Sequence, residues 1–153
     1  MIAFDTNILV YATAALADAR VERARDLLGR GMRASSVVLL LQSLAEFSNV
    51  AWRIARIPVS KIRKTIDAWC AVLPVQGADT EDLFVALEAV RVHRIAFWDA
   101  MLWAFAQRAG VKYLLTEDFQ DGFTLRGVTF VNPFKQKNDQ LIEKLVLPRS
   151  RSG

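Results

Sequence analysis

Two acidic residues of this chain stand after short apolar segments. Asp5 directly follows residues 2–4 (IAF). Asp118 comes after residues 113–115 (YLL), separated from them by Thr116 and Glu117. An acid at the end of a strand is usually a turn residue, and that alternative stands for both. The carboxyl end of a parallel strand is, however, also where such sheets bind ligands. The two acids therefore become candidates for chemistry if further acids join them.

Two more acids lie inside long apolar segments. Glu46 belongs to residues 37–52 (VVLLLQSLAEFSNVAW), and Asp99 belongs to residues 98–107 (WDAMLWAFAQ). Glu46 falls on one helical stripe with Gln42 and Asn49, which makes a thin polar line on an otherwise apolar helix. The ordinary alternatives are that Glu46 faces solvent and that Asp99 caps a helix, which is worth about 1 kcal/mol.

We expect these four acids, Asp5, Glu46, Asp99 and Asp118, to converge on one cleft. Two carboxylates about 4 Å apart repel each other by roughly 4 kcal/mol at an effective dielectric constant of about 20. A cluster of this kind therefore requires protons or a cation. Oxygen ligands alone favour a hard ion, Mg²⁺ or Mn²⁺, over a structural zinc site. Such an ion takes substrate phosphates and activates water for attack on a phosphodiester.

The single histidine does not belong to this group. His93 lies between Arg91 and Arg94, away from the acid positions, and is expected at the surface or at a helix end. The predicted site therefore has no nitrogen base, and metal-activated water is the expected nucleophile.

Apolar periodicity and the positions of glycine and proline predict alternating strands and helices. Strands are expected at residues 2–4, 34–36, 73–75, 113–116 and 128–131, and helices at 20–29, 38–53, 59–71, 80–92, 98–109 and 141–145. Alternation of this kind predicts an α/β fold, with a parallel sheet covered by helices on both faces. We expect one domain over residues 1–147 and a disordered tail over residues 148–153.

Composition limits the class of protein. Of the 153 residues, 53% are hydrophobic, which is ample for a core, and the formal net charge of +4 is a weak indication of a nucleic-acid partner. There is no recognisable targeting signal and no apolar segment long enough for a membrane span. Cys70 is the only cysteine and is expected in the core, which fits a reducing cytoplasm.

Several ordered motifs carry a resemblance to a known family. The segments FDTNILVYA, QSLAEF, FWDAMLWAFA, LLTEDFQDG and NPF follow one another at regular intervals from residue 2 to about residue 147. Together they resemble the PIN-domain ribonucleases, specifically the VapC-type toxins of bacterial type II toxin–antitoxin pairs. The resemblance implies a three-layer α/β/α sandwich around a mostly parallel sheet.

The resemblance also implies a function and a set of site residues. Its acidic quartet falls on Asp5, Glu46, Asp99 and Asp118, with Asp5 and Asp99 as metal ligands and the other two acting directly or through water. It further implies Mg²⁺- or Mn²⁺-dependent RNA cleavage, inhibition by a cognate antitoxin protein and a homodimer.

Other positions support the match or depart from it. Asn7 matches the family asparagine that orients the first acid, and Thr116 matches a hydroxyl residue that supports the last. Ala96 stands where relatives often have serine, so a supporting hydroxyl is expected to be missing. Glu117 and Asp121 flank Asp118, and which of the three completes the site stays open.

Basic residues offer an approach for RNA phosphates. The candidates are Arg53, Arg56, Lys61, Arg63 and Lys64. A solvated basic helix is the ordinary alternative for each of them.

Two other functions remain as alternatives. One is phosphoryl transfer through an aspartate nucleophile, which usually needs a second acid two residues after the first, where this chain has Asn7. The other is a PIN-like interaction module that has no catalytic activity.

Overall fold

The computed structural model describes residues 1–34 and 36–146. The tail predicted at residues 148–153 lies outside these ranges. No helix within them is long and apolar enough to cross a membrane.

A mostly parallel sheet forms the centre of the molecule. Its strands are ordered β1 (Ile2–Phe4), β4 (Tyr113–Leu115), β6 (Val128–Val131) and β5 (Thr124–Leu125), and β5 alone among these four runs antiparallel to its neighbour. A second parallel pair, β2 (Leu39–Leu40) and β3 (Val75–Gln76), adjoins β1 through a bridge between Ile2 and Val37. The sheet therefore extends on both sides of β1.

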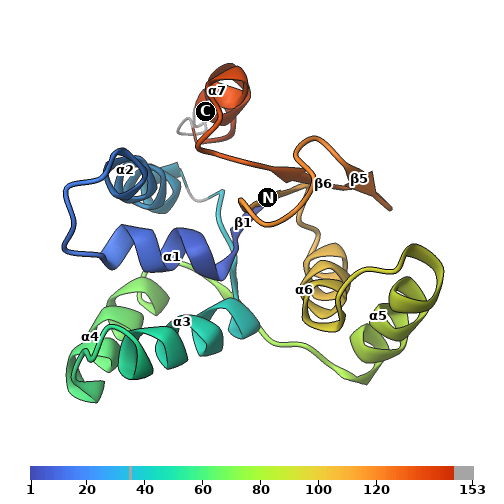
Figure 1. Ribbon diagram of the computed structural model, residues 1–153, viewed down its shortest axis with the longest axis horizontal. Coiled ribbons are helices and arrows are strands. Elements are labelled where there is room, and N and C mark those ends of the chain that lie inside the picture. The colour runs from blue at the N-terminus through green and yellow to red at the C-terminus, as the bar shows by residue number, and fades with distance from the viewer. Residues whose placement is uncertain (35, 147–153) are drawn as a thin grey trace, which may run out of the picture.

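Helices cover both faces of this sheet. They are α1 (Thr6–Thr13), α2 (Ala19–Ala34), α3 (Leu41–Arg53), α4 (Val59–Cys70), α5 (Thr80–His93), α6 (Phe97–Arg108) and α7 (Asp139–Leu145), with a 3₁₀ turn η1 at Gln136–Asn138. Figure 1 shows α1 to α4 on one side of β1 and α5 and α6 on the other.

Alternation along β1 divides the interior into two cores. Ile2 and Phe4 pack with residues of α1 to α4 and α7, whereas Ala3, which points the opposite way, packs with residues of α5 and α6. Two helical layers on a central sheet confirm the predicted three-layer α/β/α fold.

The largest error in the predicted elements is α1, which the sequence analysis missed. No helix was predicted directly after the first strand, but one begins at Thr6, with Asp5 as its N-cap and with Ile8 and Leu9 buried. The short antiparallel strand β5 was missed as well, because two residues carry almost no pattern.

The predicted strand at 34–36 is wrong. Ala34 is the last residue of α2, and the strand of this region is β2, so α3 begins at Leu41 and not at Val38. The helix expected at residues 20–29 is α2, and it continues through Gly29 and Gly31 to Ala34. A Cβ at Gly31 would lie 2.5 Å from Val37 Cγ2, so this glycine permits close packing of α2 on the sheet.

Two smaller expectations also need correction. The strand expected at 73–75 is instead β3, at Val75–Gln76. Cys70 is exposed and not part of the core, because it is the last residue of α4 and the buried residue there is Trp69.

Asp121 ties the segment after β4 to the segment before α7. Its buried side chain accepts hydrogen bonds from the Asn132 N–H and from Asn138 Nδ2, both at 2.8 Å, and it pairs with Lys137 at 2.8 Å. Burial by itself would raise the pKa of Asp121, but these donors outweigh it and lower the pKa to about 2. The carboxylate thus stabilises the fold in its ionised form.

This anchor predicts a pH-dependent effect of Asp121→Asn. The amide keeps an acceptor for its two neutral donors but loses the attraction of Lys137. Because the folded pKa of about 2 lies below the ordinary 3.8, the stabilisation is present above about pH 4 and is lost as the pH falls towards 2. We expect the variant to be about 1 kcal/mol less stable at pH 6, since the exposed lysine is screened by solvent. Thermal melts from pH 6 to pH 2.5 should show this gap closing, and an equal gap at both ends would contradict the assignment.

Candidate active site

Asp5 lies at the junction between β1 and α1. Its Oδ1 accepts from the Thr6 N–H at 2.6 Å, so it caps α1, and its Oδ2 accepts from the Thr116 hydroxyl at 2.7 Å. The side chain is almost fully buried, with 7% exposed. The turn-residue and site-residue interpretations of Asp5 are therefore compatible, because one carboxylate does both.

Thr116 and Asn7 connect Asp5 to Asp118. Parallel pairing aligns Phe4 with Leu115, so the residues that follow each strand meet at the same edge of the sheet. The Thr116 hydroxyl donates to Asp5 and accepts from the Asp118 N–H at 3.1 Å. Asn7 Nδ2 lies 2.9 Å from Asp118 Oδ2 and 3.5 Å from Asp5 Oδ2. Asn7 is thus placed between both acids and not on the first alone.

Glu46 reaches the same place from α3. Its Oε2 accepts from the Thr6 hydroxyl at 2.9 Å, and its Oε1 accepts from Gln42 Nε2 at 2.9 Å. Gln42 Nε2 also donates to the Trp98 carbonyl at 3.0 Å, which links α3 to the start of α6. The supporting role of Thr6 was missed in the sequence, where the only signal was its position beside Asp5. Gln42 had a signal, the helical stripe that it shares with Glu46.

Asp99 lies in the first turn of α6 but does not cap the helix. The N-cap position is Ala96, whose side chain offers no hydrogen bond to the helix. The supporting hydroxyl that the family resemblance leads one to expect is thus absent at that position. A negative charge in the first turn interacts favourably with the helix dipole, which suits Asp99 to this position.

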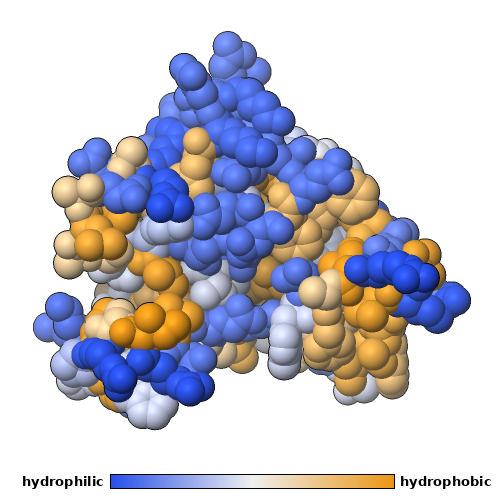
Figure 2. All heavy atoms as spheres, viewed as in Figure 1, coloured by the Kyte–Doolittle hydropathy of each residue, from blue (hydrophilic) through white to orange (hydrophobic). Residues whose placement is uncertain are grey.

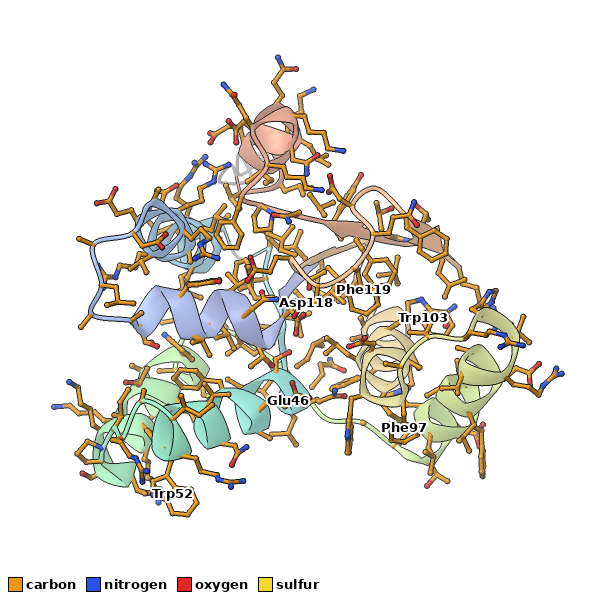
Figure 3. All side chains as sticks on the ribbon, viewed as in Figure 1. Glu46, Trp52, Phe97, Trp103, Asp118 and Phe119 are labelled. Carbon is orange, nitrogen blue, oxygen red and sulfur yellow. The ribbon has the colours of Figure 1, made fainter. Side chains whose placement is uncertain are left out.

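The four acids line one cleft of about 380 Å³. Its wall contains Asp5, Thr6, Asn7, Val10, Tyr11, Gln42, Glu46, Val50, Trp98, Asp99, Leu102 and Asp118. Figure 3 shows Glu46 and Asp118 pointing into the space between α1, α3 and α6. Figure 2 shows hydrophilic residues along the centre of this face, with hydrophobic and hydrophilic residues mixed on either side. The predicted convergence of these residues on one cleft therefore matches their placement in the fold.

The acids influence one another electrostatically. Burial raises the pKa of Asp5 to about 6 even though hydrogen bonds from Thr116 and the Thr6 N–H lower it, and the charges of Asp118 and Glu46 raise it further. Burial also raises the pKa of Asp99, and the same two carboxylates add to that shift. The cleft is therefore a site where negative charge accumulates at the expense of stability.

Comparison with known proteins supplies the family. The family model described as the PIN domain matches residues 2–123. The chain belongs to the PIN domain family. No significant match was found among curated protein sequences.

Three solved structures have the same fold as this PIN domain. The toxin VapC20 of Mycobacterium tuberculosis, described as cleaving the sarcin–ricin loop, is 20% identical with a TM-score of 0.61, over 77% of this chain and 90% of that one. A toxin–antitoxin complex from Klebsiella pneumoniae is 18% identical with a TM-score of 0.65, over 88% and 99%. FitAcB from Neisseria gonorrhoeae is 17% identical with a TM-score of 0.62, over 88% and 99%.

The other two acids near Asp118 face elsewhere in this PIN domain. Glu117 accepts from the Tyr11 hydroxyl at 2.7 Å and lies 3.8 Å from Arg20. Asp121 is engaged with Asn132, Asn138 and Lys137. Neither lines the cleft. Of the three candidates that the sequence left open, only Asp118 is placed with the other acids.

The five predicted RNA-binding cations lie outside the cleft. Arg53 ends α3, Arg56 lies in the following connection, and the other three, Lys61, Arg63 and Lys64, lie on α4. All five are exposed, and Arg63 is 3.5 Å from Asp67. Figure 3 shows Trp52, which precedes Arg53, at the opposite end of α3 from Glu46. These cations could contact only a part of an RNA strand that lies away from the acids.

The residues of the cleft fit a divalent cation in their donor chemistry. The metal-binding atoms that its acids and amides offer are all oxygens, and no described residue donates a hydrogen bond to the buried Oδ1 of Asn7, a residue of this wall. Within residues 1–34 and 36–146, however, no three His, Cys, Asp or Glu side chains lie close enough together to form a ready-made metal cage. Direct coordination by three of the acids at once is therefore not preformed among the described residues, and water would have to complete the ligand set.

The electrostatic strain predicts the effect of Asp5→Asn in the presence of a chelator. A carboxyl whose folded pKa of about 6 exceeds the ordinary 3.8 stabilises the fold only while protonated. Wild-type stability is therefore lost as the pH rises from about 4 to 6, whereas the amide does not titrate. We expect the variant to gain about 1 kcal/mol over wild type at pH 7.5, because water in the open cleft screens the repulsion.

The measurement is urea unfolding of both proteins between pH 4 and pH 7.5. Asp67→Asn, which removes an exposed acid on α4, is the matched control and should give no such trend. A difference between wild type and Asp5→Asn that does not change with pH would show that Asp5 acts only as a helix cap.

Proposed function

We propose that this PIN domain is a divalent-metal-dependent endoribonuclease and the toxin of a toxin–antitoxin pair. The observation that carries the proposal is the convergence of Asp5, Glu46, Asp99 and Asp118 on one cleft at the carboxyl edge of the parallel sheet. Carboxylates brought together at this cost to stability are typical of a functional site.

In this proposal Asp5 and Asp99 hold Mg²⁺ or Mn²⁺, and Glu46 and Asp118 act directly or through water. A bound ion of this kind neutralises charge on the phosphodiester and lowers the pKa of an attacking water. The remaining residues position the acids: Thr116 and Asn7 serve Asp5 and Asp118, and Thr6 and Gln42 serve Glu46. Donation by Thr116 and by the Thr6 N–H favours the ionised form of Asp5, which ligand binding requires.

The relatives support the biological part of the proposal. VapC20 is described as a toxin that cleaves the sarcin–ricin loop, and the Klebsiella protein was solved as a toxin–antitoxin complex. We infer that this chain likewise cleaves RNA in the cytoplasm, is inhibited by a cognate antitoxin protein and forms a homodimer. A basic antitoxin side chain near the acids would relieve their repulsion, which gives a physical reason for tight inhibition.

The geometry disfavours the aspartate-nucleophile alternative. Both oxygens of Asp5 already accept short hydrogen bonds, and Asn7 occupies the position where a second acid is needed. A non-catalytic module would have no use for an acidic cleft that costs stability.

RNA cleavage by acid variants tests the proposal. Each of Asp5→Asn, Glu46→Gln, Asp99→Asn and Asp118→Asn should lower the cleavage rate by at least about 100-fold, because each removes a charge that holds the ion or its water. The measurement is the rate of cleavage of an end-labelled RNA with Mg²⁺, with Mn²⁺ and with a chelator.

Glu117→Gln and Asp121→Asn are the matched controls, because they remove acids beside Asp118 that do not line the cleft. Both should keep a rate close to that of wild type. Wild-type cleavage that persisted in the chelator would overturn the metal-dependent mechanism, and loss of activity in both controls would overturn the assignment of Asp118.

The basic residues on α4 predict a salt effect on RNA affinity. A contact between one cation and one phosphate of a single strand contributes about 0.7 to the slope of log affinity against log salt. In the inactive Asp99→Asn background, Lys61→Gln with Lys64→Gln should therefore reduce that slope by about 1.4. The equal charge change at exposed Lys112 and Lys144 is the control. Equal slopes for the two double variants would remove α4 from the RNA path.

A further inference from the structure

Trp98 is exposed beside the acids. It precedes Asp99 in the first turn of α6, its side chain lines the acidic cleft, and 65% of its surface is accessible. Large apolar side chains that face water at a site mark a surface that binds something. None of the roles assigned above uses this indole ring.

A second cavity of about 610 Å³ adjoins the acidic cleft at Trp98. The two share Gln42, Glu46 and Trp98 in their walls. The rest of the second wall is Leu41, Ala45, Asn49, Ala78 and Met101, which is apolar apart from one amide. A ligand that spans both spaces would therefore place a charged group among the acids and a flat or apolar group against Trp98.

One contact fixes the backbone of Trp98 and another supports its ring. Its carbonyl accepts from Gln42 Nε2 at 3.0 Å, and the same amide nitrogen supports Glu46. Its ring packs edge-on against Phe97, with centroids 5.2 Å apart and planes at 69°. A fixed aromatic face loses little conformational entropy when it stacks on a ligand.

We propose that the cavity at Trp98 is a nucleobase subsite, in which one base next to the cleaved phosphate stacks on the indole. This inference rests on the proposed ribonuclease function. A nucleotide carries a flat ring with polar edges, which suits the second cavity, and an anionic phosphate, which the acidic cleft would take through the divalent cation of the proposed function. The amides of Gln42 and Asn49 lie in the same wall and can pair with the base edge. The base must be unpaired to enter, so the subsite selects nucleotides outside a duplex.

The test is a double-mutant cycle that combines the substitution of Trp98 with removal of the base from the RNA. The cleavage position is first mapped on an unpaired RNA with the wild-type protein, and the bases on either side are then replaced one at a time by abasic residues. Loss of a stacked base weakens binding by about tenfold or more. We expect one abasic position to raise KM about tenfold for wild type, and Trp98→Ala to raise KM by a similar factor on intact RNA.

The two changes together should then cost little more than either alone. Trp98→Phe should keep most of the effect, since a smaller ring still stacks. Phe84→Ala is the control, because Phe84 is a 56% exposed aromatic residue on α5 that lines neither the acidic cleft nor the second cavity. It should leave KM and the abasic effect unchanged. Anisotropy of the labelled RNA with Mg²⁺ in the inactive Asp118→Asn background measures affinity without cleavage and should show the same pattern, since Asp118 does not line the second cavity.

The other possible outcomes contradict either the proposed function or the subsite. If wild type neither binds nor cleaves RNA, the proposed function fails and the subsite fails with it. If wild type cleaves RNA but the abasic and Trp98→Ala effects simply multiply, the subsite alone is wrong. If Trp98→Ala changes the oligomeric state by light scattering while the abasic effect persists, a second copy of the chain covers this cavity instead.

Discussion

The parallel pairing of β1 with β4 is the constraint on which this site depends. It places the residues after both strands at the same edge of the sheet. The Thr116 hydroxyl can therefore donate a hydrogen bond to Asp5 and accept one from the Asp118 N–H. Buried carboxylates repel one another, and only donors fixed by the backbone keep them together. Without this strand pairing, the Asp5 side chain could move into water. Its pKa would then return towards the ordinary value, and the acids would no longer line one cleft.

Helices from opposite faces of the sheet complete the site. α3 packs in the core on one face and brings Glu46, whereas α6 packs in the core on the other and brings Asp99. The amide of Gln42 bridges them, because it donates both to Glu46 and to the carbonyl of Trp98. The distance between the two helices at the cleft is therefore set by a polar contact and not by apolar packing alone.

Asp5 combines a structural role with membership of the acidic cluster. Asp5 caps α1 through one oxygen and joins the acidic cluster through the other. Capping stabilises the helix, and clustering opposes that stabilisation. Such a compromise is typical of active sites, where stability is given up for function. Asp121, only a few residues from Asp118, has the opposite balance, since its donors lower its pKa and make it purely a structural anchor.

The sequence by itself predicted the fold class and singled out Asp5, Glu46 and Asp99 as candidate site residues, because apolar periodicity and the order of motifs can be read along the chain without coordinates. It predicted neither α1 nor the extension of α2 through Gly31, since a short polar start and a glycine both look like breaks until their packing partners are known. The tertiary structure alone separated Asp118 from Glu117 and Asp121, and it alone assigned Thr6 to Glu46. These are contacts between residues far apart in the chain, and only strand pairing and helix packing decide which distant groups meet.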